Sequence, residues 1–548
     1  MVTLAQAAPD PGDYYQVLGQ LKVAGPEAQY VEPDQRTVPW HTLRRLALLG
    51  GEFVPPYRPI TNGEITGIIQ RSRERGGPTL LNLAQRLQAS HLLHRHGLAE
   101  PGLRWDSCEC RTPQVHLQLG GRAALRELGP GGMVPQEAGL GGRGLQLDLE
   151  PDLALWSGSW WLAVSPRLAG PLSTSGRTID DAFLYENWHR ASNRPAEGDA
   201  RVDEAWRVTL PRAAIGVGLG SWALTAGVFP ASVGPGLEST GLSLTAQAES
   251  MPQVVARRTA PFEWSGFMGA IDPDHLLMRV GVTSEQTIRY TDDYGKQRYP
   301  NEPLFFQWLI TWNHTSWWRT TVTHTAMAAP RQGNTLWGDI FQINFPLLSA
   351  TQNEMDYGPV TDRIFTLGME ARFREAPWPL LPSAAGRVWW EYGGEDFNPS
   401  GTIPGVPQIS APASQAGFEL VDHRWDLGVE FLETQHPEVL WYSNSGLTEG
   451  YTNEGVVLGH ELGGGCQAWT ALIRLRPDSG LHEWVLRGRT ARWDMPRRLP
   501  TTAQRHELSL SWRRLTNPGA WTLSIGWIGE ETAGLETDWL QGGLERRF

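Results

Sequence analysis

The sequence has no run of about 18 apolar residues, so no segment of it can cross a membrane as an apolar helix. Only 3 cysteines occur, at Cys108, Cys110 and Cys466, too few for a disulfide framework and without zinc-site spacing. The net charge is -12 and the sequence contains no basic block, so it lacks the cluster of Lys and Arg that is typical of nucleic-acid-binding proteins. These absences argue against a helical membrane protein, a disulfide scaffold and a nucleic-acid-binding protein. They leave a β-barrel open, because barrel strands show alternation rather than long apolar runs.

What the chain does have is alternation of apolar and polar residues, strongest in its last third. In residues 424–431 every second position is apolar, and residues 507–513 and 521–527 repeat the pattern. A period of two is the signature of a β-strand, and segments of about ten residues cross a bilayer as tilted strands. The polar face is rich in Arg, Asp and Glu, and Trp and Phe lie near the predicted strand ends. Both features favour a transmembrane antiparallel β-barrel over a soluble β-sandwich.

Strand-like segments recur from residue 113 to the end of the chain. Long segments rich in Gly, Pro and Asn, such as 129–143, 396–415 and 436–465, alternate with short turns such as 516–519. Outer-membrane barrels alternate long outer loops with short turns in this way. We expect about eighteen strands, drawn from nineteen candidate segments at residues 115–125, 144–153, 159–166, 182–189, 202–210, 222–229, 253–262, 278–286, 304–312, 317–325, 340–345, 363–374, 386–391, 419–435, 466–476, 482–493, 507–514, 521–528 and 538–548.

Residues 35–110 differ from the rest because their apolar residues recur at helical spacing, as at Leu43, Leu46 and Leu49. A capping-box pattern that begins at Thr61 predicts the start of a second helix. The sequence therefore predicts a small helical bundle in residues 35–110 and a barrel in residues 111–548.

Residues 1–34 form an N-terminal segment without a clear element. Ala5-Gln6-Ala7 is similar to a signal-peptidase site, so residues 1–7 are interpreted as a signal-peptide remnant, with a chance match in a disordered terminus as the alternative. Three histidines close the last predicted helix, at positions 91, 94 and 96, and we interpret them as solvated rather than as a metal site. We expect no metal and no cofactor.

Two stretches resemble the Wzi-type capsule assembly family. In residues 220–262, a strand leads into the turn Gly234-Pro235-Gly236 and then into a Pro-led strand that carries Arg. Residues 436–464 are rich in aromatics and end in Leu-Gly-His-Glu-Leu-Gly-Gly. The helical lead-in at 40–49 and 59–69 is also similar to that family. One departure is that residues 243–250 contain no Asn, where family members often carry an Asn-rich run.

The resemblance implies an outer-membrane β-barrel of about eighteen strands with its helical bundle at the periplasmic end. It implies a lectin-like role, in which the barrel holds capsular polysaccharide or exopolysaccharide at the cell surface without reacting with it. The expected partners are that polysaccharide, outer-membrane lipid and the barrel-assembly machinery, which reads a terminal aromatic such as Phe548. A monomer is expected.

Glycan binding uses flat aromatic faces for sugar C–H surfaces and planar polar groups for hydroxyls. The segment 436–465 offers both kinds of group, and its candidates are Trp441, Tyr442, Asn444, Tyr451, Asn453 and His460. An equally supported alternative is that this loop folds into the barrel mouth and its aromatics merely pack. The turn Gly234-Pro235-Gly236 is interpreted as structural rather than as a ligand contact.

The polar face of the strands predicts a charged barrel lumen. Its candidate residues are Arg372, Arg424, Asp426, Glu430 and Arg487. They could line a polar conduit or cross-link the lumen by ion pairs, and we favour the ion pairs. Two other functions share the predicted fold: a channel for sugars or oligosaccharides, and an outer-membrane hydrolase of glycan or lipid. We expect no catalytic residues, because His460-Glu461 lacks the second His of a zinc-protease helix and no Gly-x-Ser-x-Gly elbow is evident.

Overall fold

The computed structural model places a barrel over most of the C-terminal four-fifths of the chain. It describes residues 30–31, 44–45, 47–49, 51, 53–54, 56–58, 60–61, 68, 116–128, 144–157, 160–172, 206–219, 222–237, 240–244, 251–258, 274–292, 295–329, 360–374, 384–398, 408–422, 424–437, 439–442, 447, 450–453, 456–477, 482–494, 502–515, 520–532 and 535–547.

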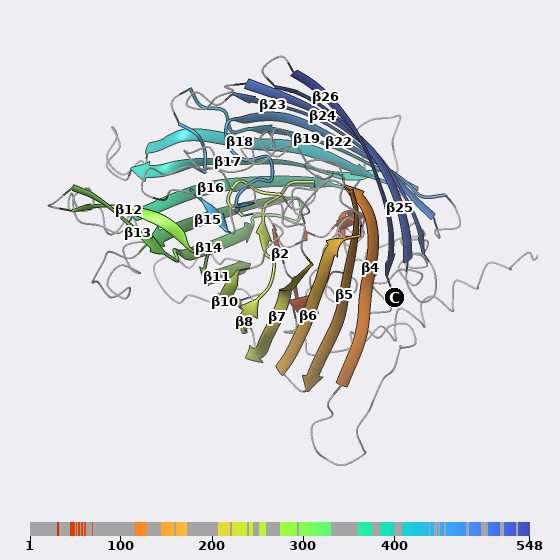
Figure 1. Ribbon diagram of the computed structural model, residues 1–548, viewed down its shortest axis with the longest axis horizontal. Helices are drawn as coiled ribbons and strands as arrows, with labels where there is room; N and C mark the ends of the chain where they lie inside the picture. Colours follow the sequence, from red (N-terminus) through yellow and green to blue (C-terminus); the bar gives the residue numbers. More distant parts are fainter. Residues whose placement is uncertain are drawn as a thin grey trace, which may run out of the picture.

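Eighteen antiparallel strands form one closed barrel (Figure 1). Neighbours in sequence pair in turn, β8 pairs with β10, and β26 pairs with β4 to close the ring. The strands are β4 (His116–Leu128), β5 (Gly144–Ser157), β6 (Trp160–Pro171), β7 (Arg207–Leu219), β8 (Trp222–Val228), β10 (Pro252–Arg258), β11 (His275–Val282), β14 (Leu304–Asn313), β15 (Trp318–Ala329), β16 (Val360–Phe373), β17 (Ala385–Asn398), β18 (Gln408–Val421), β19 (Trp425–Glu433), β22 (Cys466–Leu475), β23 (His482–Asp494), β24 (Thr502–Leu515), β25 (Ala520–Thr532) and β26 (Leu535–Arg547).

Four short pairs lie outside this ring. A hairpin of β12 (Gln286–Asp292) and β13 (Gly295–Asn301) projects from the connection between β11 and β14, and Figure 1 shows it at the edge of the molecule. The other pairs have two residues per strand: β1 (Tyr30–Val31) with β3 (Ile60–Thr61), β2 (Tyr57–Arg58) with β9 (Ser232–Val233), and β20 (Thr452–Asn453) with β21 (Val456–Val457).

The predicted barrel and its strand number are confirmed, and one strand was missed. β18 lies mostly in residues 396–415, which the sequence pattern assigned to a loop. The outward positions of its first half carry Pro412, Ser414 and Ala416, and the large apolar side chains that mark a lipid-facing strand begin only at Phe418. The single strand predicted at 419–435 is two strands, β18 and β19, joined by a short turn. The predicted strands at 182–189 and 340–345 lie outside the described residues.

The barrel is polar inside and apolar outside. In β22 the buried positions alternate strictly with exposed ones, and the exposed set includes Trp469, Ile473 and Leu475. The buried set includes Thr470 and Arg474. Soluble proteins show the opposite arrangement, so an apolar outer wall around a charged lumen fits a barrel whose outer wall contacts lipid. Among the described residues, no helix is long and apolar enough to cross a membrane.

The two ends of the barrel differ in the length of their connections. One end, the short-turn end, carries the tight connections β5–β6, β7–β8, β14–β15 and β18–β19, with the longer β10–β11 connection as an exception. The opposite end, the long-loop end, carries the long connections β4–β5, β6–β7, β8–β10, β11–β14, β15–β16 and β19–β22, with the tight β25–β26 connection as an exception. The chain thus has the asymmetry that the sequence predicted for an outer-membrane barrel.

The helical N-terminal bundle is described only in fragments. Arg44, Arg45 and residues 47–49 are helical, in agreement with the first predicted helix. Thr61, predicted to begin a second helix, pairs with Tyr30 in the short sheet of β1 and β3, and Ile68 of that predicted helix is helical. An N-cap residue has an extended backbone itself, so this pairing is compatible with a helix after Thr61, and the cap stays a prediction. The histidines at 91, 94 and 96 and most of residues 35–110 lie outside the described residues.

Candidate functional site

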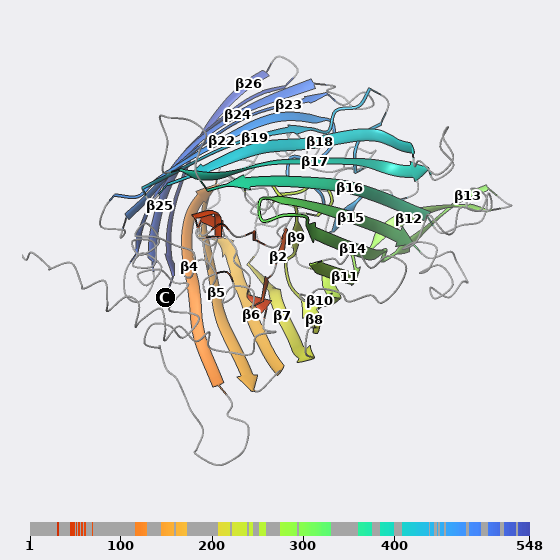
Figure 2. The same ribbon diagram turned by 180° about the vertical axis from the view of Figure 1, so that it is seen from behind.

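Three chain segments lie within the lumen of the barrel. The first is the inner loop, residues 229–244, which enters between β8 and β10. The second is the capping loop, residues 434–465, which enters between β19 and β22 from the same long-loop end. The third is the N-terminal segment, residues 44–58, which lies against the short-turn end. Figure 2 shows β2 and β9, from the third and first of these segments, inside the ring of barrel strands.

The three segments contact one another. β2 of the N-terminal segment pairs with β9 of the inner loop, and the Gly234 amide donates to the Pro56 carbonyl oxygen over 2.9 Å. The capping loop joins them because the Tyr442 hydroxyl donates to the Leu242 carbonyl oxygen over 2.7 Å. Apolar side chains from all three segments belong to the main hydrophobic cluster of the structure. They form a single packed unit inside the barrel.

Two buried arginines bind the inner loop at its Gly-Pro-Gly turn. Arg387 of β17 donates to the carbonyl oxygens of Pro235 and Gly236, over 2.6 and 3.2 Å. Arg44 of the N-terminal segment donates to the same Gly236 oxygen over 3.0 Å. Both guanidinium groups also pair with Glu419, at 3.0 Å from Arg387 and 2.7 Å from Arg44. Burial lowers the pKa of Arg44 to about 10, against the opposing effect of Glu419, so Arg44 is cationic at neutral pH.

Buried carboxylates of the wall bind the amides of the same loop. Glu430 of β19 accepts from the Leu237 amide over 2.7 Å, and Glu391 of β17 accepts from the Leu242 amide over 3.1 Å. Backbone polar groups away from water need such partners, and here ionisable side chains supply them in place of secondary structure. The wall therefore holds the inner loop by its backbone.

The turn requires glycine at its first position. Gly234 has a φ of 156°, and a Cβ there would overlap the carbonyl oxygen of Thr240 in the returning half of the loop. The Gly-Pro-Gly segment is thus a close approach between two backbone stretches, and its carbonyl oxygens face the arginines rather than the barrel mouth.

The capping loop buries the aromatic residues that the sequence singled out as glycan-binding candidates. Trp441, Tyr442 and Tyr451 are each 0% exposed. The Trp441 indole donates to the Ala411 carbonyl oxygen over 2.7 Å, and the Tyr451 hydroxyl donates into the inner loop. Burial raises the pKa of Tyr442 well above its usual value, so its hydroxyl keeps its proton. The rings pack within the lumen, which is the second of the two alternatives drawn from the sequence.

Two further candidates are buried with them. Asn453 accepts from the Ser284 amide over 2.9 Å, and the backbone amide of His460 donates to the Tyr442 hydroxyl over 3.0 Å. Asn444 lies outside the described residues. Glycan contact by these residues stays a prediction, and for the buried ones it requires the loop to leave the lumen.

An ion-pair cluster fastens the far end of the capping loop to the wall. Glu461 pairs with Arg489 and, at 3.1 Å, with Arg487, both on β23. Burial alone would raise the pKa of Glu461, but Arg489 and Arg487 outweigh it and lower this pKa to about 2. The carboxylate is therefore charged across the physiological pH range and holds the loop against β23.

Most predicted lumen residues lie on the inner wall and in ion pairs or polar contacts. Asp426 pairs with Arg45 at 3.1 Å, and Arg487 pairs with Glu461 as described. Arg372 donates to the Ser316 carbonyl oxygen over 2.6 Å. Arg424 differs, because it is exposed in the turn between β18 and β19 and does not line the lumen. The sequence pattern extended the alternation of β19 one residue too far toward the N-terminus, because the strand begins at Trp425.

The N-terminal segment is held by aromatic and cationic contacts. The guanidinium carbons of Arg319 and Arg372 lie 4.7 and 4.0 Å from the ring centre of Phe53. Arg319 also donates to the Val54 carbonyl oxygen and pairs with Glu370. Cation–π contacts are stabilising when desolvated, so these contacts hold the N-terminal segment at the short-turn end of the barrel.

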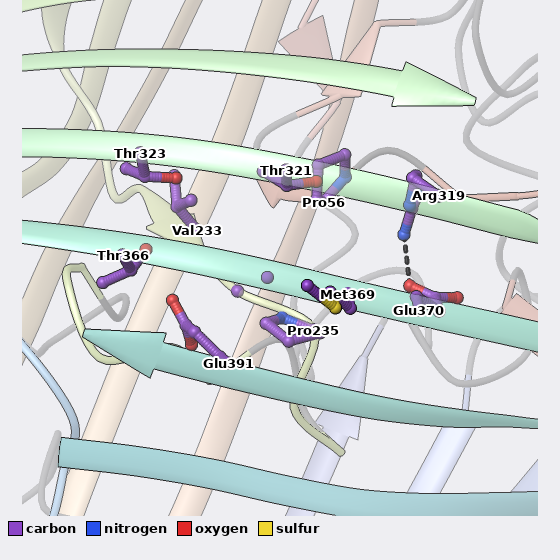
Figure 3. Close-up of a pocket in the computed structure, with 12 residues that line it drawn as sticks. Pro56, Val233, Pro235, Arg319, Thr321, Thr323, Thr366, Met369, Glu370 and Glu391 are labelled. Atoms are coloured by element: carbon purple, nitrogen blue, oxygen red, sulfur yellow. Dashed lines mark hydrogen bonds and ion pairs between the residues drawn. The ribbon is translucent and has the colours of Figure 1, made fainter. Parts of the chain in front are cut away.

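A cavity remains between the inner loop and the wall (Figure 3). Its empty space, with open solvent included, is about 320 Å³, and it is lined by threonine side chains of β15 and β16, by Met369 and Glu391, and by the Arg319–Glu370 ion pair. Pro56 and Val233 form its opposite side, next to the short β2–β9 pair. Most of its exposed lining is apolar, and the threonines, Glu391 and the ion pair supply its polar groups.

The sequence reasoning missed the residues that hold the inner loop. Arg44, Arg387 and Glu391 were not singled out, although all three are central to the site. Arg387 and Glu391 lie on inward positions of β17, the same parity as the other lumen residues. Extending the inward and outward alternation along each strand would have identified these residues as inward charges. It would not have identified the backbone groups that they bind.

The fold and the site together define a closed transmembrane β-barrel of eighteen strands whose lumen holds inward-folded segments bound by charged wall residues. A model of the family described as "Capsule assembly protein Wzi" matches residues 186–527, more than half of the chain and including both the inner loop and the capping loop. The chain belongs to this Wzi capsule assembly protein family, as its sequence motifs indicated.

A solved structure, that of the Escherichia coli protein Wzi, shows the same fold. The Escherichia coli protein Wzi is described as an outer membrane protein involved in group 1 capsule assembly and as a carbohydrate-binding β-barrel. It is 14% identical, and the match covers 93% of this chain and 98% of that chain with a TM-score of 0.58. Acinetobacter baumannii OccAB2 and Pseudomonas aeruginosa OpdK with vanillate are each 10% identical, with 79% of this chain and 97% of theirs covered, at TM-scores of 0.45 and 0.41. None of the curated proteins matches the sequence.

Proposed function

We propose that this chain is a non-enzymatic barrel of the bacterial outer membrane that holds capsular polysaccharide or exopolysaccharide at the cell surface. The observation that carries the proposal is the family match over residues 186–527. It is supported by the E. coli Wzi barrel, which has the same fold and is described as carbohydrate-binding. In this proposal the long-loop end faces outward, and Phe548, which lies outside the described residues, is the signal for barrel assembly.

The occupied lumen supports a binding protein over a channel for sugars. The inner loop and capping loop pack against the wall from the long-loop end, and the N-terminal segment packs from the other end. Channels that pass solutes by diffusion need an aqueous path, whereas these segments are joined to the wall by buried ion pairs. The channel hypothesis predicts steady conductance, which the binding hypothesis does not.

The chemistry of the lumen also supports a binding protein over a hydrolase. Glu391 and Glu430 accept backbone amides of the inner loop, and Glu419 lies between two arginines. A glycosidase needs two carboxylates with space for the sugar between them. Glu391 borders the cavity, but its carboxylate accepts from the inner loop, and the other carboxylate there, Glu370, pairs with Arg319. These carboxylates therefore act in holding protein segments.

Within this proposal the capping-loop residues have a positioning role. Trp441, Tyr442 and Tyr451 hold the loop in the lumen, and the long connections at the same end contact the polysaccharide. This assignment keeps the glycan at the long-loop end and gives a reason for the burial of the aromatic residues. A direct glycan contact by the same residues is the competing form of the hypothesis.

The deciding experiment measures polysaccharide retention on cells of the source organism. A strain that lacks the gene is expected to make the polysaccharide but release it to the medium, and the wild-type gene is expected to restore the cell-bound fraction. Purified barrel incubated with the released polysaccharide should leave its chain length unchanged. Equal retention with and without the gene would contradict the proposed function, and shortening of the polysaccharide would contradict its non-enzymatic part.

A variant pair separates positioning from general loss of the protein. Trp441→Ala should reduce retention by freeing the capping loop, whereas Arg424→Gln, in an exposed turn at the opposite end, should leave it unchanged. Both variants must be present in the outer-membrane fraction at wild-type levels. Unchanged retention in Trp441→Ala would mean that the capping loop has no part in holding the polysaccharide.

A further inference from the structure

The outer wall changes character sharply near the long-loop end of six neighbouring strands, β19 and β22 to β26. Figure 1 shows these strands side by side. Their outward side chains form rows, because directly paired residues on neighbouring strands lie on the same face. The row nearest the long-loop end is entirely polar and consists of Glu433, Gln467, Arg492, Gln504, Glu531 and Glu536.

The next row inward is mixed. It contains Phe431, Trp469, Thr490, His506, Gly529 and Asp538, paired in turn across β19 and β22 to β26. Trp469 is 57% exposed, and its ring centre lies 4.8 Å from that of Phe431. We name these two rows together the polar collar. Two pairs of collar side chains contact each other. Gln467 donates to the Glu433 carboxylate over 2.8 Å, and Thr490 Oγ1 lies 3.2 Å from His506 Nδ1.

Immediately beyond the collar the same strands become apolar. The following rows contain Leu508, Trp527 and Leu540, and then Ile473, Leu486, Leu510 and Ile525, all of them exposed. Exposed apolar rows around a barrel mark the depth of the lipid chains, so the collar lies at the depth of the lipid headgroups on the long-loop side. Whatever covers the collar in the membrane is therefore a headgroup.

The charge of the collar selects among headgroups. It carries four carboxylates, on Glu433, Glu531, Glu536 and Asp538, against the single guanidinium of Arg492. Phosphate is bound by clusters of Arg or Lys, and a wall with this balance repels it. Carboxylates and amides beside an exposed indole are instead the groups that bind sugar, by accepting from hydroxyls and packing against a C–H face.

The opposite edge of the apolar band has the opposite chemistry. There the guanidinium of Arg546 lies over the Trp521 ring at 4.9 Å, and that of Arg258 lies over the Trp222 ring at 5.9 Å. Arginine beside an interfacial tryptophan suits a phosphate-bearing headgroup. The two edges of one lipid-facing band therefore fit two different leaflets.

We propose that the polar collar binds the sugar headgroup of a glycolipid in the membrane leaflet on the long-loop side. A sugar ring packs on the exposed face of Trp469, and its hydroxyls bond to Gln467 and Glu433 beside it. The proposal does not rest on the proposed function, since the collar is on the outer wall and its ligand is a membrane lipid rather than the surface polysaccharide.

The test reconstitutes the purified full chain in phosphatidylcholine nanodiscs that contain equal amounts of digalactosyl diacylglycerol and phosphatidylglycerol. Native mass spectrometry then counts the lipids that stay bound to the released barrel. We expect several-fold more retained digalactosyl lipid than phosphatidylglycerol. Equal retention of the two, or a preference for phosphatidylglycerol, would overturn the proposal.

Variants locate the binding. The double variant Gln467→Ala/Trp469→Ala should lose the excess of digalactosyl lipid, whereas Trp390→Ala should keep it, because Trp390 is 41% exposed on β17 outside the collar. Faster gel mobility of the unboiled protein shows that each variant is folded. Trp469→Ala alone, which removes the exposed ring against which the sugar packs, provides a second test if the double variant does not fold. Retained excess in a folded collar variant would place the lipid elsewhere and overturn the assignment.

Discussion

The indole N–H of Trp441 donates to the carbonyl oxygen of Ala411 over 2.7 Å, and this bond joins the capping loop to the wall where both backbones are strained. Ala411 has a φ of 46° and Tyr442 one of 65°, and they are the non-glycine residues with positive φ in the described part of the chain. A left-handed backbone costs an L-residue about 1–2 kcal/mol. The pairing of β17 with β18 is also irregular here. Loop and wall therefore hold each other in conformations that neither would adopt alone.

Replacing this indole should release the capping loop. Trp441→Phe keeps an aromatic ring but leaves the buried Ala411 oxygen without its donor, which costs on the order of 1–3 kcal/mol. We expect faster proteolytic cleavage within residues 434–465 while the barrel strands stay protected. The matched control is Trp390→Phe, on the outward face of β17. If both variants are cut at the wild-type rate, the indole bond does not hold the loop.

Acid should loosen the same loop at its other end. The folded-state pKa of Glu461 is about 2, below its usual 4.5, so its ion pairs stabilise the loop at pH above 4.5 and are lost as the pH falls toward 2. Pepsin cleavage of the capping loop, scaled to cleavage of an unfolded substrate, should therefore rise across this window. Glu461→Gln should be cleaved faster at pH 5 and should show little further rise. The exposed Glu531→Gln should behave as the wild type. If Glu461→Gln gives the same pH profile as Glu531→Gln, the Glu461 ion pairs do not hold the capping loop.

Loss of both arginines at the inner loop should open the lumen. Arg44→Gln with Arg387→Gln leaves Glu419 and the Gly236 carbonyl without their buried cations, and breaking a buried charge pair typically costs about 3–5 kcal/mol. In planar lipid bilayers we expect no steady conductance steps from the wild type and clear steps from the double variant. The exposed Arg424→Gln, which removes one cation at the short-turn end, serves as the control. Steady conductance from the wild type would instead favour the channel hypothesis.

One wall glycine provides space for the inner loop. A Cβ at Gly428 of β19 would overlap the Leu237 side chain of that loop. Gly428→Val should therefore displace the inner loop and lower the thermal stability of the folded barrel, because overpacking typically costs about 1–3 kcal/mol. Gly488→Ala is the control, since its added Cβ would meet only Leu508, at 4.0 Å. Equal unfolding temperatures for the two variants would show that the inner loop does not depend on this contact.

The barrel was predictable because its signal is local. In the middle of β19, β22 and β24, apolar residues recur at every second position because lipid covers one face and the polar lumen lies on the other, so the sequence alone carries the pattern. The first half of β18 lacked the signal because Pro412, Ser414 and Ala416 occupy its outward face, and its pairing with β17 and β19 settles the assignment instead. The turn residue Arg424 was misplaced for the related reason that alternation does not mark where a strand begins.

The residues alone were enough to predict the class of fold and a barrel of about eighteen strands, and the Gly-Pro-Gly turn and the aromatic loop indicated the family. The places of those two motifs in the barrel became clear only from the folded chain. Trp441 and Tyr451 are candidates for exposed glycan contacts in sequence, yet they are buried in the lumen. Arg387 reaches Pro235 across 152 residues of chain. Such contacts depend on closure of the whole ring, because a local pattern specifies which face a side chain takes and cannot specify which backbone atom meets it there.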